Sequence, residues 1–289
     1  MLFWTLIALA SLSTALPAGL TRRDISSDTL DQLDLFAQYS AASYCSNNIN
    51  SSATTLSCAA GNCPEVQTAK AAPLYAFDDS TQYGDVAGFL AADDTNKLLV
   101  LSFRGSRTLG TWIANLNFDL SNSTLCSGCE VHTGFWKSWD TVSAKLTSEI
   151  DSAMKDYPGY TLVLTGHSFG AALAVLGGTA LRNAGYKPSL YTYGEPRVGN
   201  AALATYITNQ GSLWRVTHTD DIVPKLPPAS FGFSQPSPEY WITSGDNVTV
   251  TTSTIQVIQG VGSDSGNAGT SGASIEAHKW YFEDVDACQ

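Results

Sequence analysis

A serine between two glycines is the feature of this sequence with the clearest chemical meaning. The stretch GHSFG, residues 166–170, follows the apolar segment 162–164 and precedes the small, apolar segment 171–178. In a G-x-S-x-G turn between a strand and a helix, the glycines leave room for a sharp turn that presents the serine hydroxyl. The helix that follows places its positive end near the hydroxyl, where it favours developing negative charge. The pattern therefore predicts that Ser168 is a nucleophile.

A serine hydroxyl is a poor nucleophile unless a base takes its proton and an acid orients that base. The chain has four histidines, namely His132, His167, His218 and His278. In strand–G-x-S-x-G–helix enzymes the chain order is serine, acid, histidine. Only His278 lies beyond every plausible acid, so we predict that His278 is the base.

The acid must lie between Ser168 and His278. The candidates there are Glu195, Asp220, Asp221, Glu239, Asp246, Asp264 and Glu276. A triad acid belongs on a loop at the end of a strand, and Asp220 and Asp221 directly follow the strand-like segment 213–217. The residues by themselves do not separate these two.

Strand-like and helix-like segments alternate around this motif. Apolar residues at helical spacing predict helices over 30–44, 135–150 and 169–182. Short apolar runs predict strands at 86–92, 98–103, 162–164, 190–193, 213–217 and 240–243. The alternation predicts an α/β fold with a central, mostly parallel sheet flanked by helices. The Gly/Ser-rich stretch 260–272 is expected to be a surface loop, and we find no internal repeat or linker.

The N-terminus has the pattern of a secretory leader. Residues 1–10 are an apolar run of signal-peptide length, and Arg22 and Arg23 form a dibasic step typical of pro-peptide cleavage. We expect 1–23 to be a signal peptide with a short pro-peptide, and 24–289 to be a single secreted domain. No later segment approaches the ~18 apolar residues of a membrane span.

The chain is acidic, with 15 Lys+Arg against 26 Asp+Glu. Removing residues 1–23 takes away two arginines and no acid, so the net charge becomes 13 minus 26, or -13. Nucleic-acid binding depends on a basic surface, as does electrostatic docking on anionic membranes. The composition therefore argues against both kinds of partner.

Six cysteines in a secreted chain indicate disulfides. Cys126 and Cys129, with His132 nearby, also raise the possibility of a zinc site, but no fourth ligand is evident, so we expect a small-loop disulfide and no metal. The N-x-S/T triplets at Asn50, Asn122 and Asn247 predict glycosylated surface loops.

Several longer motifs together resemble a known family. In order along 24–289 they are SFRGS (102–106), GHSFGAAL (166–173), YGEPRVGN (193–200), THTDDIVPKLPP (217–228), SPEYW (237–241) and AHKWYF (277–282). They are similar to the fungal class 3 lipases of the Thermomyces and Rhizomucor type. LDLFAQYSAASYC (33–45), DDTNKLLVLSFRGS (93–106) and CEVHTGFWKSW (129–139) resemble most the phospholipases A1 secreted by Aspergillus within that group.

The resemblance implies an α/β-hydrolase fold and a set of site residues. Ser168 would be the nucleophile, His278 the base and Asp221, rather than Asp220, the acid. The loop residue Ser106 and the residue after the nucleophile, Phe169, would form the oxyanion hole. The implied disulfides are Cys45–Cys288, Cys58–Cys63 and Cys126–Cys129. No cofactor is implied. Two positions depart from the usual lipase pattern, since Phe169 stands where leucine is common and Ala171 where glycine is usual.

The resemblance also places a lid helix over 109–116. Its apolar residues Leu109, Trp112, Ile113 and Leu116 recur at helical spacing. In water this apolar face should cover the site, and at a lipid surface it can turn outward. An acidic protein would then reach lipid through apolar contacts rather than charge. We expect a monomer with a lipid substrate at an interface.

These observations predict a secreted serine hydrolase of glycerolipid acyl esters, acting as phospholipase A1, triacylglycerol lipase or both. Ala114 matches the phospholipase-like lid better than the lipase-like one. A feruloyl esterase acting on plant cell-wall esters is an alternative, because CEVHTGF and YGEPRVGN are close to its motifs too, although the apolar lid argues against it. An inactive lipid- or carbohydrate-binding protein is the alternative from another class, and the intact set of catalytic residues argues against that.

Overall fold

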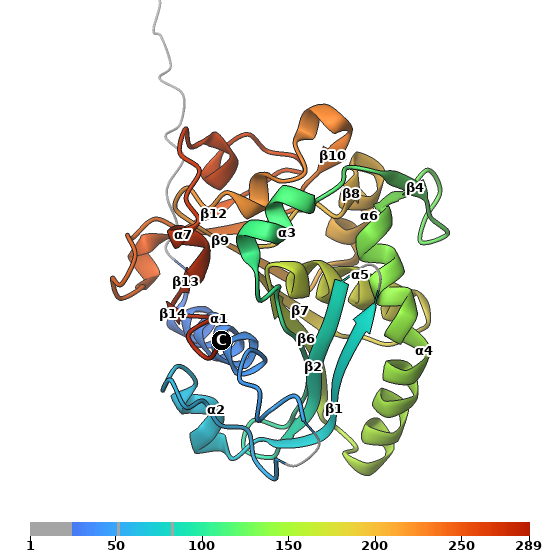
Figure 1. Cartoon of the computed structure of the whole chain (residues 1–289), viewed down its shortest axis with the longest axis vertical. Coiled ribbons are helices and arrows are strands. Elements are labelled where there is room, and N and C mark those ends of the chain that lie inside the picture. The colour runs from blue at the N-terminus through green and yellow to red at the C-terminus, as the bar shows by residue number, and fades with distance from the viewer. Residues whose placement is uncertain (1–24, 51–52, 82–83) are drawn as a thin grey trace, which may run out of the picture.

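The computed structural model describes residues 25–50, 53–81 and 84–289, so the expected signal peptide and pro-peptide lie outside the described residues. An eight-stranded sheet in the order β1-β2-β3-β6-β7-β9-β11-β12 runs through the molecule (Figure 1). Its strands are β1 (Ala72–Thr81), β2 (Gly84–Asp93), β3 (Leu98–Phe103), β6 (Thr161–His167), β7 (Ser189–Tyr193), β9 (Leu213–His218), β11 (Glu239–Ile242) and β12 (Ile255–Ile258). From β3 to β11 the neighbours are parallel, and the outer pairs are antiparallel. The predicted α/β fold with a mostly parallel sheet is confirmed.

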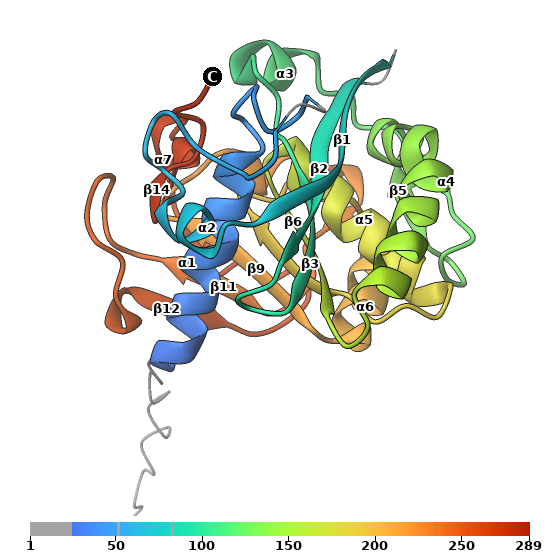
Figure 2. The ribbon, with the colours of Figure 1, turned by 90° about the horizontal axis from the view of Figure 1, so that it is seen from below.

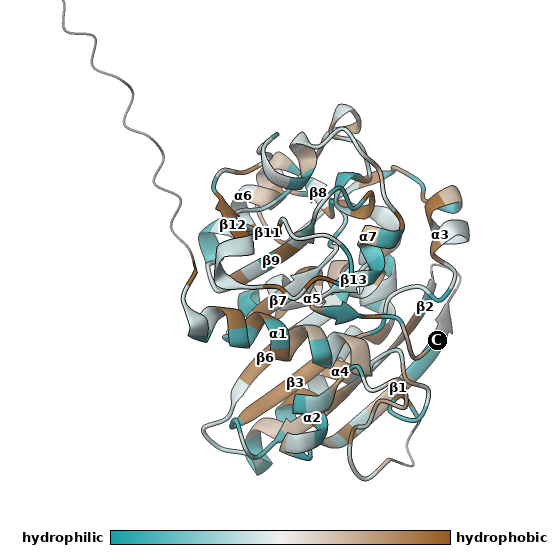
Figure 3. Cartoon of the chain, turned by 90° about the vertical axis from the view of Figure 1, so that its left-hand side faces the viewer, coloured by the Kyte–Doolittle hydropathy of each residue, from teal (hydrophilic) through white to brown (hydrophobic). Residues whose placement is uncertain are grey.

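Helices cover both faces of this sheet (Figure 2). On one side lie α1 (Ser27–Ala42) and α2 (Pro64–Ala69), and on the other lie α4 (Thr133–Asp156), α5 (Phe169–Asn183) and α6 (Ala201–Gln210). A strand covered on both faces must be apolar along its length. The central strands β3 and β6 are accordingly buried and strongly hydrophobic (Figure 3). Two apolar clusters result, one on each face of the sheet.

The helices follow the predicted periodicity. In α4 the buried positions include Phe135, Trp139, Val142, Leu146 and Ile150, which form one apolar stripe against the core. In α1 the Ser26 side chain caps the N-terminus by accepting a hydrogen bond from the backbone N–H of Thr29. The predicted spans 30–44 and 135–150 therefore correspond to α1 and α4, with boundaries shifted by a few residues.

Helix α5 is buried on nearly every side, which explains its small residues. A Cβ at Gly177 would lie 2.7 Å from the Trp139 ring, and one at Gly178 would lie 2.2 Å from a methyl group of Leu190. A glycine inside a helix costs about 1 kcal/mol relative to alanine. The close packing of α5 against α4 and β7 requires it at both positions.

A smaller four-stranded sheet lies beside the main one, in the order β10-β8-β5-β4. Its strands are β4 (Leu120–Asn122), β5 (Glu130–His132), β8 (Gly199–Asn200) and β10 (Phe233–Ser234). The remaining short elements include the helix α3 (Leu109–Asn115), the helix α7 (Glu276–Lys279) and the pair β13 (Trp280–Tyr281) and β14 (Glu283–Asp284). The stretch 260–272 is loop apart from one short 3-10 turn, Gly266–Gly269, as expected.

The six cysteines form three disulfides, Cys45–Cys288, Cys58–Cys63 and Cys126–Cys129. These are the pairs that the family resemblance implies. The first joins residues 243 positions apart and ties the chain end to the segment after α1. Of the described residues, no helix has the length and apolar character needed to cross a membrane.

Candidate active site

Ser168 occupies the turn between β6 and α5. Its backbone has φ 59° and ψ −125°, which lies outside the favoured regions for a residue with a side chain. A Cβ at Gly166 would lie 2.5 Å from the Gly170 backbone, and one at Gly170 would lie 2.2 Å from the carbonyl oxygen of Phe103. The two glycines therefore permit α5 to begin against the ends of β3 and β6, and the packing holds Ser168 in its strained conformation.

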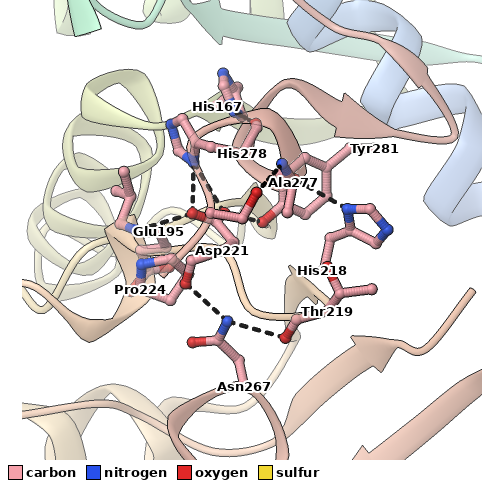
Figure 4. A network of polar contacts seen from close by, with 12 residues as sticks. His167, Glu195, His218, Thr219, Asp221, Pro224, Asn267, Ala277, His278 and Tyr281 are labelled. Atoms are coloured by element: carbon pink, nitrogen blue, oxygen red, sulfur yellow. Dashed lines mark hydrogen bonds and ion pairs between the residues drawn. The ribbon is translucent and has the colours of Figure 1, made fainter. Parts of the chain in front are cut away.

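The structure brings His278 and Asp221 into contact, as Figure 4 shows. His278 Nδ1 lies 2.8 Å from one carboxylate oxygen of Asp221 and 3.0 Å from the other. Both side chains are buried. Asp220, which the residues alone could not separate from Asp221, faces the loop at Gly272 instead, where a Cβ would lie 1.8 Å from its carboxylate.

Two further donors hold the Asp221 carboxylate. The backbone N–H of Val223 donates to Oδ1 at 2.8 Å, and the hydroxyl of Tyr281 donates to Oδ2 at 2.5 Å. Burial, with the adjacent Asp221 charge as a second cause, raises the pKa of Tyr281 well above its ordinary value, so the hydroxyl keeps its proton. Sequence reasoning missed Tyr281, although it lies within the AHKWYF motif.

The residues at the end of β7 contact both Ser168 and His278. The backbone N–H of Ser168 donates to the carbonyl of Tyr193 at the end of β7, and the next residue, Gly194, packs against the His278 ring. Gly194 has φ +57°, and a Cβ there would lie 2.7 Å from His278 Cε1. Among the described residues, the buried Oγ of Ser168 and Nε2 of His278 have no hydrogen-bond partner. Catalytic hydrogen bonds are often formed only when substrate is bound.

The two candidate oxyanion residues come from the loop after β3 and from the start of α5. Ser106 follows β3, whose carboxyl end is adjacent to that of β6 in the parallel sheet. A Cβ at Gly105 would be 2.9 Å from the carbonyl oxygen of His167, so this loop packs directly on the turn. Phe169 is the first residue of α5, where backbone N–H groups have no partner within the helix. The loop before Ser106 and the start of α5 therefore both adjoin the turn that holds the serine.

Helix α3 lies next to this site. Its residues Leu109, Trp112 and Ile113, with Leu116 directly after it, are half-buried, and the residues between them are exposed. The Trp112 ring stacks on Phe135 at 6.2 Å, and Phe135 lies 5.9 Å from the Phe169 ring. Trp112, Leu116, Phe135 and Phe169 are among the residues that line a cleft of about 290 Å³, and Phe169 directly follows the serine in the chain. Ser168 and His278 are only 2% and 1% exposed.

His132 has a structural role instead of a metal-binding one. Its Nδ1 accepts a hydrogen bond from the Phe135 backbone at the start of α4, and its Nε2 donates to the carbonyl of Asn117. Burial lowers the pKa of His132 to about 4, which keeps the ring neutral. Cys126 and Cys129 are joined in a disulfide, so their sulfur atoms are not free thiolates that could bind zinc with His132. Asn50, Asn122 and Asn247 are exposed, and their glycosylation stays a prediction.

Glu195, one of the acids considered for the triad, makes no hydrogen bond to His278. Burial raises its pKa from 4.5 to about 7, against the opposing effect of Arg215. Because the folded protein holds this proton more tightly than the unfolded chain, the free energy of unfolding should fall as pH rises from about 4.5 to 7.

We expect Glu195→Gln to remove this pH dependence of the free energy of unfolding. Relative to the native protein, the variant should gain stability between pH 5 and 8, by up to about 3 kcal/mol. Urea unfolding at several pH values measures the difference. If the two stability curves run parallel from pH 5 to 8, Glu195 does not titrate in this range.

Comparisons with known proteins identify a family of lipases. Residues 100–231 match the family described as Lipase (class 3), and residues 2–75 match the Lipase 3 N-terminal region. The secreted mono- and diacylglycerol lipase A of Penicillium camembertii is 49% identical, covering 99% of this chain and 95% of its own. A lipase of Rhizomucor miehei is 35% identical, covering 90% and 70%.

Solved structures of lipases are also similar to this chain. The mono- and diacylglycerol lipase of Aspergillus oryzae superposes with a TM-score of 0.87 and 41% identity, over 91% of this chain and all of the other. A triacylglycerol lipase, described as having a serine protease triad at its catalytic centre, superposes with a TM-score of 0.80 and 31% identity, over 92% and 99%. The chain therefore belongs to the fungal class 3 lipases, a family of secreted carboxylic-ester hydrolases.

Proposed function

We propose that Ser168, His278 and Asp221 form the catalytic triad of this lipase. His278 Nε2 takes the proton of the Ser168 hydroxyl as Oγ attacks the ester carbonyl, and the same proton later passes to the departing alcohol. Asp221 holds the proton on Nδ1, which leaves Nε2 free to accept. Water then releases the fatty acid from the acyl-enzyme. The observation that carries the proposal is the buried His278–Asp221 pair beside a serine held in a strained turn.

The oxyanion of the tetrahedral intermediate would be stabilised by the backbone N–H groups of Ser106 and Phe169. The Ser106 hydroxyl is a further donor. Backbone donors held by packing need no reorganisation as charge develops, and one such donor is worth roughly 2.7–4 kcal/mol. Catalysis by this set requires no cofactor.

We propose acylglycerols as the substrates, with mono- and diacylglycerols foremost. The relatives with the highest identity reported above are named for these partial glycerides. The lining of the cleft by Trp112, Leu116, Phe135 and Phe169 suits an acyl chain. Phospholipase A1 activity is the second candidate, favoured by Ala114 in the lid and by the exposed Arg107, a cation beside Ser106 that could meet a phosphate.

One assay separates these activities. The purified protein is given dioctanoylglycerol, trioctanoylglycerol, dioctanoyl phosphatidylcholine and methyl ferulate under the same conditions, and fatty-acid or ferulate release is followed. We expect the partial glyceride to be hydrolysed fastest. Faster hydrolysis of the phosphatidylcholine would establish the phospholipase, and faster release of ferulate would establish the feruloyl esterase. No release from any of the four would support the inactive binding protein.

We also propose that α3 is a lid that opens at a lipid surface. The rate on a short-chain glyceride should then rise abruptly where the substrate passes its solubility limit. Trp112→Ala removes the stacking on Phe135, worth about 0.5–1.5 kcal/mol. It should raise the rate on dissolved substrate roughly 2- to 10-fold and reduce the increase in rate at the solubility limit.

Trp214→Ala is the matched control, because Trp214 stacks on Tyr191 away from α3. This variant should show the same increase in rate at the solubility limit as the native enzyme. Smooth saturation of the native enzyme through the solubility limit would show that α3 does not gate the site.

A further inference from the structure

A second histidine lies against the proposed base and has no part in the mechanism above. The rings of His167 and His278 are 4.4 Å apart, and both are buried. His167 Nε2 lies 2.7 Å from the backbone carbonyl oxygen of His278. A carbonyl oxygen only accepts hydrogen bonds, so Nε2 of His167 carries a proton and donates it to the backbone of His278.

The other nitrogen of His167 faces a buried tyrosine. Nδ1 lies 2.7 Å from the hydroxyl of Tyr44, just beyond the end of α1. Burial, reinforced by the nearby His278, lowers the pKa of His167 well below its ordinary value, so the ring is neutral and Nδ1 accepts. Burial also raises the pKa of Tyr44 above its ordinary value, so its hydroxyl keeps the proton that it donates to Nδ1.

The Tyr44 hydroxyl contacts a third segment. A Cβ on Gly105 would lie 2.0 Å from the Tyr44 oxygen, which means that the backbone of Gly105 packs directly against it. Gly105 immediately precedes Ser106, the proposed oxyanion residue. The oxyanion loop therefore packs on Tyr44, and hydrogen bonds run from Tyr44 through His167 to the backbone of His278.

We propose that Tyr44 and His167 are positioning residues, which fix the location of the oxyanion loop relative to the base. We call these two side chains the Tyr44–His167 bridge. This rests on the roles proposed for Ser106 and His278. Transition-state stabilisation needs both groups at the right place together, and a shift of one ångström can cost about 100-fold in rate. The Cys45–Cys288 disulfide adjoins Tyr44 and anchors that end of the bridge. A neutral His167 also avoids repelling the imidazolium that forms on His278.

Tyr44→Phe tests the bridge, since it removes the hydroxyl and keeps the ring. The loss of one well-placed hydrogen bond should lower kcat about tenfold and leave KM nearly unchanged. Tyr39→Phe is the matched control, because Tyr39 is also buried, on α1, and its hydroxyl donates to Asp93, which lies outside the set of site residues described above. That variant should lower the melting temperature while kcat stays within about twofold of the native value.

His167 offers a rescue experiment. Glutamine can accept from Tyr44 through its carbonyl and donate to the His278 carbonyl through its amide, whereas leucine can do neither. His167→Leu should lower kcat about 100-fold, and His167→Gln should restore most of that loss. Equal kcat values for Tyr44→Phe and Tyr39→Phe, or equal losses for the two His167 variants, would overturn the bridge. Failure of the native protein to react with a phosphonate at Ser168 would instead overturn the proposed triad.

Discussion

Replacing Ser168 with alanine is expected to lower kcat roughly a millionfold on any ester that the native enzyme hydrolyses. The hydroxyl oxygen is the atom that would bond to the acyl carbon, and no other described side chain in the turn can replace it. Substrate binding should persist, because the cleft that Phe169 helps to line does not include the Ser168 side chain. The measurements are kcat on dioctanoylglycerol and covalent labelling by a fluorophosphonate, which should be lost.

Ser102→Ala is the matched control for this experiment. Ser102 is also a buried serine, on β3, but its hydroxyl donates to the backbone carbonyl of Tyr39. The control should lose some stability and keep its labelling and most of its activity. If Ser168→Ala still hydrolysed esters at a rate near the native one, the proposed nucleophile would be wrong.

Asp221→Asn is expected to lower kcat about 10⁴-fold while leaving the fold intact. The Val223 N–H will continue to hold the amide oxygen at the Oδ1 position, so the amide NH2 group must take the place of Oδ2. That NH2 group would face Nδ1 of His278, which must then accept instead of donate. The His278 proton moves to Nε2, and Nε2 can no longer receive the Ser168 proton.

Asp220→Asn provides the control, because it makes the same chemical change one residue away. The Asp220 carboxylate lies 3.4 Å from the Thr219 hydroxyl and makes no described contact with His278. We expect its kcat to stay within a few-fold of the native value. Comparable losses in the two variants would mean that the contact between Asp221 and His278 is not the orienting interaction.

Local sequence patterns predicted most of the helices and strands because those patterns depend on neighbours a few residues apart. Helices α1, α4 and α5 and strands β3, β6, β7 and β9 were all predicted from apolar spacing. The first strand of the sheet, β1, was not. It is an edge strand that pairs with β2, and much of it is not fully buried. Its apolar residues 72–77 include Pro73, which argues against a strand interior, and residues 78–81 are polar.

Chain order and strand ends could also predict part of the site. In a parallel sheet, the carboxyl ends of neighbouring strands lie at one edge, so groups that follow them meet there. This places the segments after β3, β6, β7 and β9 together and makes Ser168, His278 and one of two aspartates reasonable predictions. The family resemblance then favoured Asp221.

The sequence alone therefore determined the strand-turn-helix at Ser168, the late histidine and a short list of acids. The choice between Asp220 and Asp221 depends on the turn after β9, where a bridge between Asp221 and Ser274 directs one carboxylate to His278 and the other to Gly272. The contacts of Tyr44 and His278 with His167 join residues 123 and 111 positions apart. Gly194 packs against His278 and Tyr281 donates to Asp221, and these contacts also join residues far apart in the chain. Contacts of this kind leave no periodic signal in the chain, because they exist only after the sheet, its helices and the C-terminal segment have packed.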